Sequence, residues 1–248
     1  MDSRDVNIVF PVVSKTVQFE SQFVALGGIF PIVEIVNRDL QTGLHHFKIC
    51  KRLPHTGKRM LDGAVAEAKR QIEHFWSVLS YVRDCQIVGT GECLYEVDGV
   101  LHPVTSADGI SLFGSATLTS LTSAKWFATN EENFHRTYNF DLLKRYNYSL
   151  AISEPIGRFV SLYTLLASQC ADKQQQVDDA IRGLDANVEL SLSPIGGGKL
   201  ETVYTRLRNE LAHVRPNASI FDTHHNIELH LPRFEWIVKS VVSKRIVL

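Results

Sequence analysis

The sequence lacks the features that assign a chain to several special classes of protein. Its four cysteines (Cys50, Cys85, Cys93 and Cys170) are far apart and form no CxxC pair, so reduced thiols in the cytoplasm are the simplest interpretation. No apolar stretch reaches the roughly 20 residues that a transmembrane helix needs. The first residues lack the charged-then-apolar order of a signal peptide. These absences predict a cytoplasmic protein that does not insert into a membrane.

An excess of charge of one sign is also lacking. The 248 residues include 26 basic and 27 acidic side chains, which gives a formal net charge of -1. A field that attracts nucleic acid over the whole surface is therefore excluded, and a polyanionic partner must bind at a local patch. With 44% hydrophobic residues, the chain can bury the core of one large domain or of two small ones.

The first half is predicted to be rich in β-strands. Runs of β-branched and aromatic residues occupy residues 6–10, 17–23, 32–36 and 46–50. Turn residues separate these runs, which favours an antiparallel meander. Apolar residues then recur at spacings of three and four over residues 61–82, which predicts one long helix with Phe75 and Trp76 in the core.

The second half is predicted to be helical. Amphipathic stretches cover residues 140–150, 174–184, 199–214 and 234–243. A further helix is expected to begin at Ser153-Glu154-Pro155, with Ser153 as the cap and the proline in the first turn. The predicted fold class is α+β. A β-rich domain that contains one long helix spans residues 1–135, and an all-α helical bundle spans residues 136–248.

The helix expected over residues 199–214 carries the most informative side chains. Its apolar stripe consists of Leu200, Val203, Tyr204, Leu207, Leu211 and Val214. At about 100° per residue, Asn209 and His213 fall on the opposite face with Arg206 beside them, and Arg208 lies on the flank. Pro216 disfavours helical geometry at the residue before it, so the helix should stop near Val214. That stop places His213 in the last turn.

An arginine and a histidine in this arrangement suit RNA cleavage without a metal. The helix dipole favours the imidazolium at the last turn and would hold its pKa near or above the ordinary value of about 6.5. Such a ring can remove the proton of a 2′-hydroxyl or protonate the 5′-oxygen leaving group. The guanidinium can bind the phosphate bidentately. One helix supplies one such histidine, so the reaction is easier if two copies meet across a dimer interface.

Two strings in the second half resemble a known family. Residues 204–213 (YTRLRNELAH) resemble the signature of the HEPN superfamily, in particular its ApeA-like and MauJ-like branches: an arginine, often followed by asparagine, then four to six residues and a histidine. Residues 153–163 (SEPIGRFVSLY) resemble an earlier core helix of the same family. The resemblance covers roughly residues 146–248 and leaves the first half unassigned.

The resemblance implies a helical bundle that usually dimerises and often acts as a metal-independent endoribonuclease in toxin or antiphage roles. By position it makes Arg208 and His213 the catalytic pair and Asn209 the polar residue that follows the arginine. RNA is then the substrate, no cofactor is expected, and an antitoxin or another regulatory protein is an expected partner. Arg215 stands where one toxin branch has a tyrosine, so the resemblance does not extend to that branch.

Substrate-binding roles are predicted for three arginines, two of which have an alternative role. Arg206, Arg158 and Arg215 can contribute to a local basic patch around the catalytic pair. Arg206 can instead pair with Glu210 four residues later, and Arg158 can bridge helices of the bundle. Arg208 and His213 themselves can be a surface arginine and a helix-ending histidine.

A metal site is not predicted. His224, His225 and His230 lie in a segment interpreted as extended, where adjacent side chains point to opposite faces and do not easily share one ion.

Many members of the family lack nuclease activity. The alternative function is therefore a non-catalytic dimerisation or regulatory module whose N-terminal domain binds a protein or small-molecule partner.

Overall fold

The computed structural model divides the chain into two compact units, Met1–Leu143 and Lys144–Leu248. It describes residues 4–13, 17–19, 22–25, 32–39, 44–53, 58–83, 88–89, 93–97, 99–103, 120–136, 138–194, 198–213 and 218–247. The division falls within a helix, α3 (Phe140–Ala151). The boundary expected from the sequence was at residues 135/136, before this helix. The mixed α+β class predicted from the sequence is confirmed.

The first unit is organised around an antiparallel sheet. Its strands are β1 (Arg4–Val13), β3 (Gln22–Ala25), β4 (Ile32–Asp39), β5 (Leu44–Leu53), β6 (Val88–Gly89), β7 (Leu94–Val97) and β8 (Val100–Pro103). They follow the order β3-β4-β5-β1-β7-β8, and β6 also pairs with β1. A separate parallel pair joins β2 (Val17–Phe19) to β9 (Ser120–Thr122). The predicted runs 6–10, 32–36 and 46–50 lie in strands. The run 17–23 covers β2 and the start of β3, and residues 20 and 21 lie outside the described residues.

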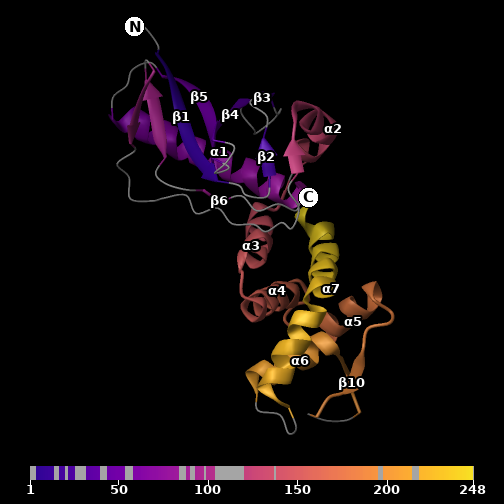
Figure 1. The fold of residues 1–248 in the computed structure, drawn as a ribbon. Helices are drawn as coiled ribbons and strands as arrows, with labels where there is room; N and C mark the ends of the chain where they lie inside the picture. Colours follow the sequence, from indigo (N-terminus) through magenta and orange to yellow (C-terminus); the bar gives the residue numbers. More distant parts are fainter. Residues whose placement is uncertain are drawn as a thin grey trace. The chain divides into compact units, whose positions relative to one another are not determined.

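Two helices complete the core of the first unit. α1 (Lys58–Arg83) lies along one face of the sheet (Figure 1). The ring of Phe47 on β5 lies 4.7 Å from that of Trp76 on α1, and both Phe75 and Trp76 are buried, as predicted. α2 (Ala124–His135) begins at a Ser123 cap and packs Phe134 against Phe75, with their ring centroids 5.7 Å apart.

Strand β8 forms one end of the sheet. Among the strands that the structure describes, it is hydrogen-bonded to β7 alone, in the register Leu94↔Pro103 to Val97↔Val100. Gly99, with φ of +80°, sits in the tight turn that joins the two strands and adopts the left-handed backbone that glycine tolerates best. Val100, Leu101 and Pro103 are exposed.

The second unit is a helical bundle with one small hairpin. Its helices after α3 are α4 (Pro155–Gln169), α5 (Gln174–Leu184), α6 (Val203–Ala212) and α7 (Ile220–Ile246). Both α4 and α6 pack against α7 (Figure 1). Phe234 of α7 joins them, because its ring lies 5.1 Å from Phe159 of α4 and 4.7 Å from Tyr204 of α6.

The bundle differs from the all-α prediction by the hairpin of β10 (Leu190–Leu192) and β11 (Leu200–Thr202). The helix predicted over residues 199–214 therefore begins only at Val203. Thr202 ends the strand and caps the helix, with its side-chain oxygen accepting from the Thr205 amide. The prediction was wrong here because Leu200 has the helical spacing but lies in β11, where its side chain is exposed.

The last helix is longer than predicted. α7 begins at Ile220 rather than at residue 234, and Pro232 lies inside it. The histidines at 224, 225 and 230 are therefore helical, and their assignment to an extended segment was wrong. Proline usually marks a helix end because it lacks an N–H, which is why the pattern before it was not recognised as helix. Among the described residues, no helix is both long enough and apolar enough to cross a membrane.

The start of α4 is capped by Glu154 rather than by Ser153. The Glu154 carboxylate accepts hydrogen bonds from the amides of Ile156, at 2.9 Å, and of Gly157. Gly157 leaves room for this return, because a Cβ there would lie 3.1 Å from Glu154 Oε2. These backbone bonds lower the pKa of Glu154. Pro155 occupies the first turn, as predicted.

We expect replacement Glu154→Gln to reduce the free energy of unfolding at pH 7 by about 0.5–1 kcal/mol, since it removes a charged cap. The folded pKa is lowered, so the contribution is present above the unfolded value of about 4.3 and is lost as pH falls through the folded pKa. Urea unfolding at pH 7 and pH 3 measures this difference. Glu228→Gln, on the exposed face of α7, is the control. A wild-type advantage that stays constant with pH would contradict the assignment.

Candidate functional site

Arg208 lies on α6 with its side chain exposed. One guanidinium nitrogen, Nη1, donates to Oδ1 of Asn209 at 3.0 Å. The guanidinium carbon lies 6.0 Å from the ring centroid of Tyr163 on α4, at the outer limit of a cation–π contact. The hydrogen bond occupies one of five N–H donors. The guanidinium therefore keeps most of its capacity to bind a phosphate from solvent.

Asn209 is buried, with only 5% of its surface exposed, so its predicted place on the solvent face was wrong. Its Nδ2 donates to Glu201 on β11 at 3.3 Å and to Gln174 on α5 at 3.4 Å. The prediction assumed that α6 is covered on one side only. In the structure α4 and α7 pack against the helix, and so do α5 and the hairpin. The amide of Asn209 thus links a buried carboxylate to the guanidinium of Arg208.

A second buried carboxylate, Asp178 of α5, fixes the start of α6. Asp178 is 2% exposed, and its Oδ1 accepts three hydrogen bonds: from the Thr202 amide at 3.0 Å, from the Thr202 hydroxyl at 2.8 Å and from the Thr205 hydroxyl at 2.7 Å. All three donors belong to the first turn of α6 or to its cap. The carboxylate therefore holds the helix that carries Arg208.

Tyr163 connects this network to Arg208. Its hydroxyl lies 3.0 Å from that of Thr205. Because the Thr205 proton is donated to Asp178, the tyrosine is the donor in this pair. Burial raises the pKa of Tyr163, the charges of Asp178 and Glu201 act in the same direction, and the Thr205 bond and Arg208 oppose them. The tyrosine is therefore held as a neutral hydrogen-bond donor at neutral pH.

His213 follows α6 directly rather than lying in its last turn. Its backbone is extended, with φ of -142° and ψ of 141°, and its amide donates to the Asn209 carbonyl at 2.9 Å. The helix ends two residues earlier than predicted. The ring is exposed and makes no hydrogen bond or ion pair with any other residue that the structure describes. It is therefore accessible to a substrate.

Two of the arginines predicted to bind substrate are engaged within the fold. Arg206 pairs with Glu189 at 2.9 Å and, more loosely, with Glu210 at 3.7 Å. Arg158 bridges α4 and α7 through Glu235 at 3.1 Å, and it also donates to the Ile152 carbonyl. Both alternatives raised by the sequence, an ion pair with Glu210 and a bridge between helices, are therefore realised. Arg215 lies outside the described residues.

Metal ligands do not gather around this site. Within the ranges that the structure describes, no group of three or more His, Cys, Asp or Glu side chains is placed to hold an ion. His224, His225 and His230 are spread along α7.

Comparisons with models of protein families, with curated proteins and with solved structures find no match to this chain.

The residues that hold Arg208 in place are Tyr163, Asp178, Glu201 and Thr205. None of them was singled out from the sequence. One signal was available: Asp178 lies between Val177 and Ile181 on the apolar face of its helix, and a carboxylate there must be paired. Its partners come from a distant segment, which the sequence does not reveal.

We expect Asp178→Ala to reduce the free energy of unfolding of the second unit by about 3 kcal/mol or more, because three buried donors lose their acceptor. Asp179→Ala is the matched control. Asp179 is exposed and pairs with Arg182 on the surface, so its loss should cost no more than about 0.5 kcal/mol. Urea unfolding, with hydrogen exchange over residues 203–212, measures both. Equal effects of the two substitutions would disprove the role given to Asp178.

Proposed function

We propose that this protein is a metal-independent endoribonuclease of the HEPN type, with Arg208 and His213 as the catalytic pair. The observation that carries the proposal is the contrast between these two side chains and their surroundings. Both are exposed, Arg208 on α6 and His213 directly after its last residue, while the residues that support Arg208 are buried and hydrogen-bonded. A positioned guanidinium and an accessible imidazole five residues apart in the chain are the groups that a reaction at a phosphodiester needs.

The reaction proceeds by attack of a ribose 2′-oxygen on the adjacent phosphorus. His213 removes the 2′-hydroxyl proton, the bond from O2′ to phosphorus forms, and the bond from phosphorus to O5′ breaks. Arg208 binds the non-bridging oxygens, whose negative charge increases in the transition state. The 5′-oxygen takes a proton from the imidazolium of a second copy of the chain. The products are a 2′,3′-cyclic phosphate and a 5′-hydroxyl.

Asn209 acts as a positioning residue in this scheme. It is buried and does not touch substrate, but its Oδ1 accepts from Arg208 and its Nδ2 is fixed by Glu201. The hydrogen bond restricts a long side chain that would otherwise sample many rotamers, and less conformational entropy is then lost when a phosphate binds. The asparagine that follows the arginine in the family signature has a physical role on this interpretation.

We infer a toxin or antiphage role from the resemblance, with a local rather than a global contact to RNA. The near-neutral chain attracts nucleic acid weakly, and Arg206 and Arg158 are neutralised by carboxylates. We therefore expect a short substrate footprint, such as an exposed loop of a folded RNA, with a weak dependence on salt.

Incubation of purified protein with tRNA and mRNA in EDTA tests the proposal. Arg208→Ala and His213→Ala should each slow cleavage by about a hundredfold or more. Arg182→Ala and His225→Ala are matched controls, since each removes the same type of exposed or surface-paired side chain elsewhere in the unit. The product ends should be 2′,3′-cyclic phosphate and 5′-hydroxyl.

Two outcomes would reject the nuclease. Cleavage that is equal in wild type and both site variants would assign the activity to a contaminant. No cleavage by folded wild-type protein on any RNA tested would favour the alternative, a non-catalytic regulatory module whose N-terminal domain binds a partner.

A further inference from the structure

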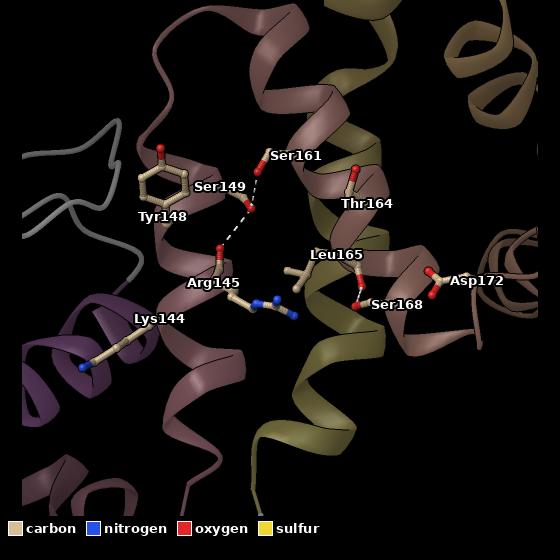
Figure 2. A pocket seen from close by; sticks show the side chains of 9 residues that line it. All are labelled: Lys144, Arg145, Tyr148, Ser149, Ser161, Thr164, Leu165, Ser168 and Asp172. Carbon is tan, nitrogen blue, oxygen red and sulfur yellow. Dashed lines mark hydrogen bonds between the residues drawn. The ribbon is translucent and has the colours of Figure 1, made fainter. Parts of the chain in front are cut away.

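A groove of about 680 Å³ lies between α3 and α4 (Figure 2). Its volume is in the range of sites that bind small molecules. The groove is separate from the Arg208–His213 site. Tyr163, which contacts Arg208, and Thr164, which lines the groove, are neighbours on α4, and consecutive helical residues point about 100° apart.

Arg145 of α3 supplies the groove with a positive charge. Figure 2 shows its side chain extending from α3 toward the space beside Leu165 of α4. The guanidinium makes no hydrogen bond or ion pair with any other residue in the described part of the chain, and the side chain is exposed. A guanidinium stays charged at all relevant pH values and matches the oxygens of a phosphate or carboxylate.

The serine and threonine hydroxyls of the groove already donate their protons within the protein. Thr164 donates its proton to the Val160 carbonyl at 2.8 Å, and Ser168 donates to the Leu165 carbonyl at 2.7 Å.

The serine pair behaves in the same way. Ser149 donates to the Arg145 carbonyl at 3.0 Å, so in its 2.8 Å contact with Ser161 the proton comes from Ser161. Ser149 is 2% exposed and already accepts from Ser161, and Ser168 also accepts from Gln169 Nε2 at 3.1 Å. The accessible oxygens of Ser161, Thr164 and Ser168 keep free lone pairs, so a ligand must bring O–H or N–H donors to them.

Asp172 limits the charge that a ligand can carry. It follows α4 in a left-handed backbone with φ of 54°, and its carboxylate lines the groove on the side away from α3 (Figure 2). A carboxylate accepts from hydroxyl groups and repels a second phosphate. Lys144 also lines the groove, and Figure 2 shows its side chain on the opposite side of α3 from Arg145. Two basic side chains and one carboxylate leave a net charge of +1, which suits a ligand with a single anionic group and does not suit a continuous RNA strand.

Apolar surface completes the groove. Tyr148 of α3 is 60% exposed, and Leu165 contributes an aliphatic surface from α4. Both can pack against the C–H face of a ring that carries hydroxyl groups on its edge.

We propose that the groove binds a small phosphorylated sugar. The phosphate lies on Arg145, the sugar hydroxyls donate to the serine and threonine oxygens and to Asp172, and the C–H face of the sugar packs on Tyr148 and Leu165. The site is independent of the proposed nuclease, because no groove residue belongs to the Arg208–His213 arrangement.

Isothermal titration of the full chain with ribose 5-phosphate and glucose 6-phosphate tests the proposal. Arg145→Gln should weaken binding about tenfold or more, through loss of a charge-assisted contact. Thr164→Phe should abolish binding by filling the groove. Lys244→Gln removes the same charge from an exposed position on α7 and should leave affinity unchanged. If Thr164→Phe fails to fold, Arg145→Gln still decides, because its exposed side chain has no partner among the described residues.

Four results would overturn the assignment. They are no binding of either sugar phosphate at millimolar concentration, equal binding by all variants, equal affinity for inorganic phosphate alone, and tenfold tighter binding of a nucleoside monophosphate. Tight binding of unphosphorylated ribose or glucose would remove the role of Arg145.

Discussion

The buried carboxylate of Asp178 is the constraint on which the rest of the second unit depends. A charged group at 2% exposure is stable only when hydrogen bonds replace its water, and here three donors from residues 202 and 205 do so. These donors lie at the junction where strand β11 becomes helix α6. The carboxylate therefore determines where the helix starts, and with it the position of Arg208.

The polar residues around α6 form two layers, a buried one that is hydrogen-bonded within the protein and an exposed one that faces solvent. The inner layer, which includes Asp178, Thr205 and Tyr163, is saturated with hydrogen bonds and adds rigidity. Asn209 lies between this layer and the solvent, and its amide is used on both sides. Arg208 and His213 are exposed to solvent and keep N–H groups that can bind a ligand. The proposed catalysis at a phosphate would benefit from such a rigid support beneath exposed side chains.

The parts of the fold with strong periodicity were predictable from the sequence. The strand runs of the first half and helix α1 were located correctly, because β-branched runs and a three-four repeat have few alternative interpretations. Predictions failed where a local pattern competes with a tertiary contact. Leu200 has helical spacing but pairs with Leu192 in the hairpin, and α7 continues through Pro232 because its buried residues on both sides hold it in place.

The candidate site was predictable in part. The types of residue and their order along the chain pointed to Arg208 and His213, and both are accessible. The angular position of Asn209 on an isolated helix predicts a solvent-facing side chain, but β11 and α5 cover that side of α6. Support for a surface side chain comes from segments distant in sequence, such as Glu201 and Gln174. The sequence of α6 alone does not identify these distant partners.

Pro103 at the rim of the first unit has a consequence for how copies of this protein behave together. A terminal strand with free amides and carbonyls is a template on which another chain can add. Pro103 lies in β8 and has no amide to offer, so a foreign strand aligned there loses a rung of its ladder. The exposed valine and leucine of that strand therefore lie next to a position where pairing with a second copy is weakened.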